Sequence, residues 1–340
     1  MTIRTFIRLS DTTSRCVLKL PSYTVKLHIP YTYKNVRGFR RLKNSFKQPE
    51  SPFTRLNAEN RPVQFSKLLK PFVFTITFTG VTIVTTAIWE YESIRKQTYK
   101  IINHFRQYYN VKTGWRKEME VWWRNLTDGQ RMFAPICFLN VLVFLAWRVP
   151  ALQNIMLRYF CANPASSASC WSMILSTFSH YSLLHLAANM YVLHSFSTGI
   201  VASLGKEQFL ALYLSSGVIS SFASHFYKVV FGLPGLSVGA SGAIMGVLGF
   251  VCTEYPDTRL AIFFLPMFTF TASMAIKVTM TLDFTGCVLG WKYFDHAAHL
   301  GGALFGMQVF WQAWGNANIW RKREPILMFW HELRNPRKSQ

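Results

Sequence analysis

Seven long apolar segments constrain the fold of this chain more than any other feature. A helix needs about 20 mostly apolar residues to cross the hydrocarbon core of a bilayer. Segments of this kind lie at residues 71–89, 132–147, 183–204, 209–231, 237–252, 260–280 and 294–311. Half of the 340 residues are hydrophobic and only 15% are charged, as is typical of multi-pass membrane proteins. We therefore predict an all-α polytopic membrane protein.

The alternation of charged and apolar stretches predicts four parts. The first is a basic segment, the second holds one extra transmembrane helix at 71–89 and an amphipathic connector, the third is a six-helix core, and the fourth is a basic tail. Their boundaries are 1–66, 67–130, 131–315 and 316–340.

The first part is strongly basic, with 13 Lys or Arg and three Asp or Glu. It is rich in Lys, Arg and hydroxyl residues, nearly free of acids, and has no continuous apolar segment of the secretory type. This pattern is typical of a mitochondrial transit peptide. Basic segments also bind nucleic acid, but the membrane-embedded remainder argues against that partner. The lipid bilayer is the expected surroundings.

Four polar side chains within the apolar segments are candidates for chemistry, because polar groups at membrane depth are costly and are often functional. They are His185 and Asn189, Ser241, and His299. Each side chain lies near the start of its apolar segment. The three segments that carry them are separated from one another by one intervening apolar segment. Since alternate spans run in the same direction, we predict that all four side chains lie near one membrane face.

The chemistry of these four side chains predicts a serine hydrolase. Ser241 would attack a carbonyl carbon, and His299 would take its proton and later protonate the leaving group. His185 and Asn189 are four residues apart and share one helix face. With the backbone N–H of Ser241 they would form an oxyanion hole.

Glycines flank both reacting residues. Gly239 ends a loop rich in breakers, Gly242 and Gly246 follow the serine, and Gly302 and Gly306 follow the histidine. Such spacing lets two helix backbones approach closely. We predict that the two glycine faces meet and bring serine and histidine within hydrogen-bond distance. The alternative is that these glycines serve close packing alone.

Other interpretations of the same residues remain open. His296 and His299 could hold a metal, but the Glu of the zincin motif is missing. Asp295 could orient His299 as a third member or cap its helix. Cys161 and Cys170 share one loop and could pair in an oxidising compartment. A transporter would show an internal repeat of broken helices with midplane charges, and the sequence shows neither.

Taken together, the motifs resemble those of rhomboid intramembrane serine proteases. The resemblance rests on Gly239-Ala-Ser-Gly, His185-x-x-x-Asn189 and Ala298-His299-x-x-Gly302-x-x-x-Gly306, and residues 130–315 resemble the six-helix rhomboid core. The extra span and the transit peptide resemble the mitochondrial, presenilin-associated branch. Met245 departs from the bacterial members, which have Tyr there. Trp147-Arg148 corresponds to the Trp-Arg pair of the first long loop, here directly after a span.

The resemblance implies a Ser241–His299 dyad without an acidic member, which agrees with the absence of a well-placed buried Asp in the predicted spans. It implies no cofactor, the oxyanion groups named above, and single-pass membrane proteins as substrates, entering beside the helix that contains Pro266. It also implies the mitochondrial inner membrane and roles in quality control, dynamics and apoptosis. A catalytically silent relative would usually lack the serine or the histidine. Both chain ends are basic, so the positive-inside rule does not choose an orientation.

Overall fold

The computed structural model describes residues 17–20, 23–26, 63–103, 114–262, 265–310 and 323–335. The chain divides into two compact units, residues 1–50 and 51–340. The described part of the first unit is an antiparallel hairpin of β1 (Val17–Leu20) and β2 (Tyr23–Lys26). The predicted transit peptide lies mostly outside the described residues and stays a prediction.

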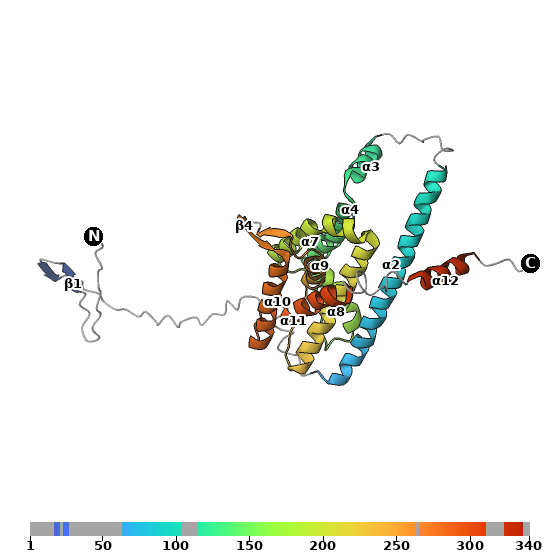
Figure 1. Ribbon diagram of the computed structural model, residues 1–340. Helices are drawn as coiled ribbons and strands as arrows, with labels where there is room; N and C mark the ends of the chain where they lie inside the picture. The colour runs from blue at the N-terminus through green and yellow to red at the C-terminus, as the bar shows by residue number, and fades with distance from the viewer. Residues whose placement is uncertain are drawn as a thin grey trace, which may run out of the picture. The chain divides into compact units, whose positions relative to one another are not determined.

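The second unit is built from apolar helices (Figure 1). They are α2 (Leu69–Asn103), α4 (Asp128–Ala146), α7 (Leu183–Leu204), α8 (Lys206–Val230), α9 (Ser241–Glu254), α10 (Ala272–Leu289) and α11 (His296–Leu304). A 3-10 turn, Phe65–Leu68, precedes α2, and a π-helical turn, Phe305–Phe310, follows α11. Within the described residues, four stretches are long and apolar enough to cross a membrane: Phe65–Tyr99, Asp128–Ala146, Lys206–Val230 and Ala272–Leu289. The all-α polytopic fold is confirmed, whereas a count of seven crossing helices stays a prediction.

Helix α9 occupies the centre of the unit, among α7, α8, α10 and α11 (Figure 1). It is almost entirely apolar, and it packs with α7 and α8 into the main core cluster, which includes Leu193, Phe209, Tyr213, Val247 and Phe250. Helix α8 is the most enclosed of the four long apolar helices, because 67% of its most apolar stretch is buried inside the protein. Helix α2 packs against α8 from outside. Residues that start α9 are therefore held on several sides.

The expected helix over 260–280 is wrong. Residues Arg259–Ile262 (β3) and Leu265–Thr271 (β4) form an antiparallel hairpin, and α10 begins only at Ala272. Pro266 would cost about 3 kcal/mol inside a helix, whereas the edge of a two-stranded sheet tolerates it. Thr271 then caps α10 by accepting the N–H of Met274. Helix α10 consequently continues to Leu289 and includes Asp283.

The first predicted span, 71–89, lies within α2, which continues to Asn103. The described residues also include two amphipathic helices: α3 (Trp115–Asn125) lies in the expected connector, and α12 (Glu324–Arg334) lies in the basic tail. Helix α12 is joined to α2 by ion pairs of Arg323 with Glu90, at 3.1 Å, and of Arg334 with Glu92.

The long loop after α4 contains helix of its own. It holds α5 (Gln153–Tyr159) and α6 (Ser169–Leu175), with 3-10 turns at Pro150–Leu152 and Ser176–Phe178. Trp147 donates its indole N–H to Ser179 Oγ at 2.9 Å, and Arg148 donates to the carbonyl of Tyr181 at 2.6 Å. These bonds fix the segment that leads into α7. Cys161 and Cys170 are free thiols.

Candidate active site

Ser241 is the first residue of α9. The backbone N–H groups at a helix start lack partners within the helix and favour negative charge nearby. The loop before it turns sharply at Gly239, whose φ of 127° suits glycine. Gly239 N–H donates to the carbonyl of Ser176 at 3.0 Å, which fixes the loop against the 3-10 turn before α7. The serine is thus held at a helix start by a braced loop.

His299 lies opposite this serine. Its Nε2 is 2.9 Å from Ser241 Oγ. Helix α11, which carries His299, begins one turn earlier, where the Asp295 carboxylate accepts the N–H of Ala298 at 3.1 Å. Asp295 therefore caps the helix, one of the two roles considered for it from sequence.

The helices that carry the two residues touch through glycine. A Cβ on Gly302 would lie 2.0 Å from the carbonyl oxygen of Gly242, and one on Gly306 would lie 1.9 Å from that of Gly246. Any side chain at Gly302 or Gly306 would force α9 and α11 apart. The structure therefore brings the two glycine faces into backbone contact.

A third helix contributes to this close approach. A Cβ on Gly242 would meet Ser220 Oγ at 2.2 Å, and one on Gly246 would meet Ser216 Oγ at 2.0 Å. Both serines lie on α8. The small residues after Ser241 thus admit α8 as well as α11, a contact that the sequence analysis did not foresee.

A buried aspartate lies beside His299, contrary to the sequence-based expectation. Asp283 on α10 is 5% exposed, and its Oδ1 lies 3.2 Å from His299 Nδ1. The same oxygen lies 2.7 Å from His296 Nδ1. A Cβ on Gly286, one turn after Asp283, would lie 2.5 Å from the His296 ring, so glycine leaves room for that ring. The error follows from placing α10 too early in the chain.

The hydrogen bonds define the roles of the His299 nitrogens. A carboxylate oxygen accepts hydrogen bonds, so Nδ1 of His299 carries the proton and its N–H donates a hydrogen bond to Asp283 Oδ1. Nε2 is then the acceptor, and the Ser241 hydroxyl donates to it. Serine, histidine and aspartate are thus arranged as the three groups of a serine hydrolase triad.

The two candidate oxyanion residues are placed differently. The ring of His185 lies against the loop before the serine: a Cβ on Gly239 would lie 2.7 Å from His185 Cε1. Asn189 is one turn further along α7, and its amide donates to the carbonyl of His185 at 2.9 Å. In this state the Asn189 amide is engaged with its own helix.

His180 also lies at the site. The N–H of Ala240, the residue before Ser241, donates to His180 Nε2 at 3.3 Å. Burial, with a contribution from neighbouring His185, lowers the pKa of His180 to about 3. A neutral ring is what this bond requires, since only neutral imidazole accepts. Among the described residues, no group of three or more His, Cys, Asp or Glu side chains could hold a metal ion.

Comparisons with known proteins identify the family of this chain. The Rhomboid domain model matches residues 167–315. Human "Presenilin-associated rhomboid-like protein, mitochondrial" is 52% identical over 292 residues, 82% of this chain and 75% of the relative. Yeast "Rhomboid protein 1, mitochondrial" is 35% identical over 187 residues, 54% of each chain. "Rhomboid protease GluP" of Bacillus subtilis is 30% identical over 136 residues, 40% of this chain and 24% of the relative. The chain therefore belongs to the rhomboid family of intramembrane serine proteases, within its presenilin-associated rhomboid-like branch.

Proposed function

We propose that the chain hydrolyses peptide bonds in or near the transmembrane segments of single-pass proteins, with Ser241 as nucleophile and His299 as base. The observation that carries this proposal is the 2.9 Å contact between His299 Nε2 and Ser241 Oγ at the start of a buried helix. The relatives and the apolar helices indicate a mitochondrial multi-pass membrane protein, and we infer that it lies in the inner membrane. Quality control, membrane dynamics and apoptosis are the processes we propose it serves.

The geometry supports a two-step acyl transfer. Ser241 Oγ attacks the substrate carbonyl carbon while His299 Nε2 takes the hydroxyl proton. The resulting oxyanion is bound by the Ser241 N–H, and we assign His185 and Asn189 as the side-chain donors. The amide nitrogen leaves with the proton from His299. Water then attacks the acyl-enzyme with His299 again as base, which releases the second product.

Binding of the oxyanion requires a side-chain rearrangement at Asn189. Its amide now donates to the His185 carbonyl, but an amide group has two N–H donors. A rotation would direct the second N–H towards the oxyanion. The loss of one such donor typically costs about 10²–10³ in kcat, so Asn189→Ala should show a fall in that range at unchanged KM.

Asp283 acts on the base rather than on the substrate in this proposal. By accepting Nδ1–H of His299 it holds the ring in the tautomer that leaves Nε2 free to accept. It also stabilises the imidazolium that forms when His299 takes the serine proton. His296, bonded to the same oxygen at 2.7 Å, holds the carboxylate in place.

The substrate class follows from the chemistry of helices. A transmembrane helix hides its amide bonds in internal hydrogen bonds, so a protease must first unwind it. We propose that substrates enter at the flank of α10, because only 22% of this apolar helix is buried inside the protein. Pro266 lies in β4 and not in the helix at this flank. Leucine-stiffened substrate helices should be cut more slowly than helices with Gly or Pro near the membrane face. Equal rates would contradict this.

The decisive experiment is reconstitution of the protein in liposomes with a model single-pass substrate. Ser241→Ala and His299→Ala should each abolish cleavage. The matched controls are Ser195→Ala and His194→Ala, exposed residues of the same two types on α7, which should cleave as the wild type does. Cleavage by either site variant would exclude the proposed roles.

A further inference from the structure

A second polar cluster lies close to the active site, and the chemistry described above does not use it. Asp295 Oδ2 accepts hydrogen bonds from Ser224 at 2.5 Å and from Ser237, and forms an ion pair with Lys228 at 3.3 Å. Lys228 also donates to Ser237 Oγ. The Lys228 side chain is 11% exposed and that of Asp295 22%. We call these four residues the Lys228 cluster.

The cluster joins the two chain segments that carry the reacting groups. Ser237 lies four residues before Ser241, and Asp295 lies four residues before His299. Ser224 and Lys228 lie one turn apart at the end of α8 and contact both segments. The nucleophile and the base are thus connected by a second route, independent of their own hydrogen bond.

Backbone bonds connect the cluster directly to His299, and on the other side they anchor Ser237, which reaches Ser241 through the chain. Ser237 forms a two-way backbone bridge with Ala162, at 3.0 and 2.9 Å. Asp295 caps α11 through Ala298 N–H, and its carbonyl accepts the N–H of His299 at 3.1 Å. A shift of Ser237 relative to Asp295 would therefore be passed on to the two ends of the Ser241–His299 hydrogen bond.

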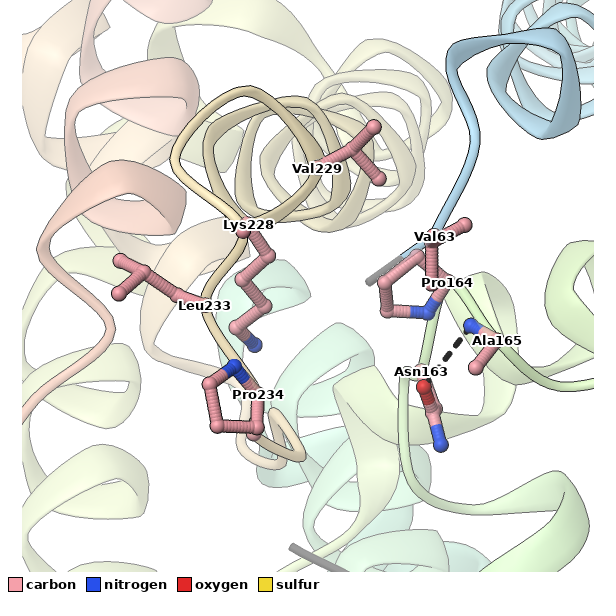
Figure 2. A pocket seen from close by; sticks show the side chains of 10 residues that line it. Val63, Asn163, Pro164, Ala165, Lys228, Val229, Leu233 and Pro234 are labelled. Carbon is pink, nitrogen blue, oxygen red and sulfur yellow. Dashed lines mark hydrogen bonds between the residues drawn. The ribbon is translucent and has the colours of Figure 1, made fainter. Parts of the chain in front are cut away.

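The same contacts argue against a second catalytic centre. A Ser237–Lys228 pair could in principle work as serine and lysine base. Here Lys228 donates hydrogen bonds to Ser237 Oγ and to the Asp295 carboxylate, so its amine is engaged as a donor and not as a base. Figure 2 shows its amine directed between Pro234 and the turn that contains Asn163. The cavity there has a volume of about 20 Å³, enough for one water and not for a peptide.

We propose that Lys228 and Asp295 are positioning residues for the rhomboid reaction: their ion pair sets the distance between the Ser241 loop and the His299 helix. The proposal rests on the roles given above to Ser241 and His299. Because the cluster lies away from the reacting atoms, its loss should reduce kcat and leave KM unchanged.

The test uses Lys228→Met and Asp295→Asn in the full-length protein in liposomes. Asn keeps an oxygen for the helix cap but loses the charge. Each variant should lower kcat about tenfold, since small displacements of reacting groups cost up to about a hundredfold in rate. The labelling rate of Ser241 by a fluorophosphonate should fall in parallel, because that reagent needs the activated serine and no bound substrate helix.

Three further variants make the result specific. Lys228→Arg keeps the charge and should restore most of kcat. The double variant Lys228→Met/Asp295→Asn should be no slower than the slower single variant, because both remove the same ion pair. Lys206→Met at the other end of α8 removes a lysine that also pairs with an acid, Glu207, and should leave kcat unchanged.

Two results would overturn the proposal. One is a Lys228→Met protein with kcat and labelling rate within twofold of the wild type, whatever happens to its thermal unfolding midpoint. The other is a loss confined to KM. If Ser241→Ala or His299→Ala still cleaves, the proposed chemistry fails. If both are inactive while the Lys228 variants are normal, only the positioning role fails.

Discussion

Among its neighbours, helix α11 contacts α9 and α10 in different ways. Against α9 the contact is backbone on backbone, through Gly302 and Gly306. Against α10 it depends on one buried carboxylate, Asp283, bonded to two histidines of α11. Close packing of two backbones allows only one distance between the helices, whereas hydrogen bonds between side chains can break and re-form. The comparison teaches that nucleophile and base are held by a backbone contact, while the acid lies on a helix that meets α11 through hydrogen bonds.

The surroundings of the two neighbours agree with this. Helix α9 is buried along most of its length. Helix α10 exposes large apolar side chains, including Leu282, Phe284 and Val288. Near its end it accepts a hydrogen bond from Tyr227 of α8 to the carbonyl of Cys287, at 2.6 Å. Helix α10 is thus held by an apolar contact at its start, where Ala272 and Ile276 pack against α9 and α11, and by a few polar bonds further along.

The largest effect should come from a side chain placed in the backbone contact. Gly302→Val would put its Cβ 2.0 Å from the Gly242 carbonyl oxygen, so α9 and α11 must separate. We expect loss of cleavage and a strongly lowered thermal unfolding midpoint, since overpacking typically costs about 1–3 kcal/mol or more. Gly199→Val is the control, because a Cβ on Gly199 meets nothing within 4 Å. An active, stable Gly302→Val protein would break the comparison.

The next effect concerns Asp283, the buried acid on α10. Asp283→Asn keeps the size of the side chain but no longer stabilises charge on His299, and it permits the wrong tautomer. We expect kcat to fall about 10²–10⁴-fold with KM unchanged, by analogy with the loss of the aspartate in serine protease triads. Steady-state kinetics on a single-pass substrate measures this. Asp257→Asn, at an exposed turn, is the control, and equal kcat for both variants would show that Asp283 has no part in catalysis.

A smaller effect should follow from disturbing the α10–α11 contact without changing charge. Gly286→Ala places a Cβ 2.5 Å from the His296 ring, which must tilt and pull on the shared carboxylate oxygen. We expect a fall in kcat of about tenfold, within the range for misplaced catalytic groups. Gly80→Ala on α2 has open space around it and should leave kcat unchanged. If Gly286→Ala matches that control, the contact is more tolerant than we argue.

The smallest effect should be a gain. Tyr227→Phe removes the bond that ties the end of α10 to α8. A hydrogen bond of this kind contributes about 1 kcal/mol, so kcat/KM on a single-pass substrate should rise by up to about fivefold. Cleavage of a short soluble peptide, which does not need α10 to move, should not change. A decrease with both substrates would argue against movement of α10.

Sequence reasoning located the polar residues of the site because the signals are local. His185, Ser241 and His299 each follow a breaker or a polar turn and start an apolar run, and alternation of direction along the chain places them at one face. The hairpin at 259–271 could not be found in this way. Leu260-Ala-Ile-Phe-Phe-Leu fits a helix or a strand equally well by hydrophobicity, and only the pairing of β3 with β4 decides between them.

That single error concealed a functional residue. With the helix ended near residue 280, Asp283 falls in a connecting stretch and has no reason to face His299. With the helix begun at Ala272, Asp283 and Gly286 lie on the face turned to α11. His180 was missed for another reason: its role is to accept a backbone N–H from a loop 60 residues away, and no sequence pattern marks that bond.

The position of α2 has a consequence for how a substrate helix reaches the site. Helix α2 packs on α8 and α6, and Figure 1 shows it on the flank of the core opposite α10. An additional transmembrane helix on that flank neither covers α10 nor competes with an incoming polypeptide for the same lipid-facing surface. Helix α2 therefore leaves clear the flank at which we propose that substrate helices arrive.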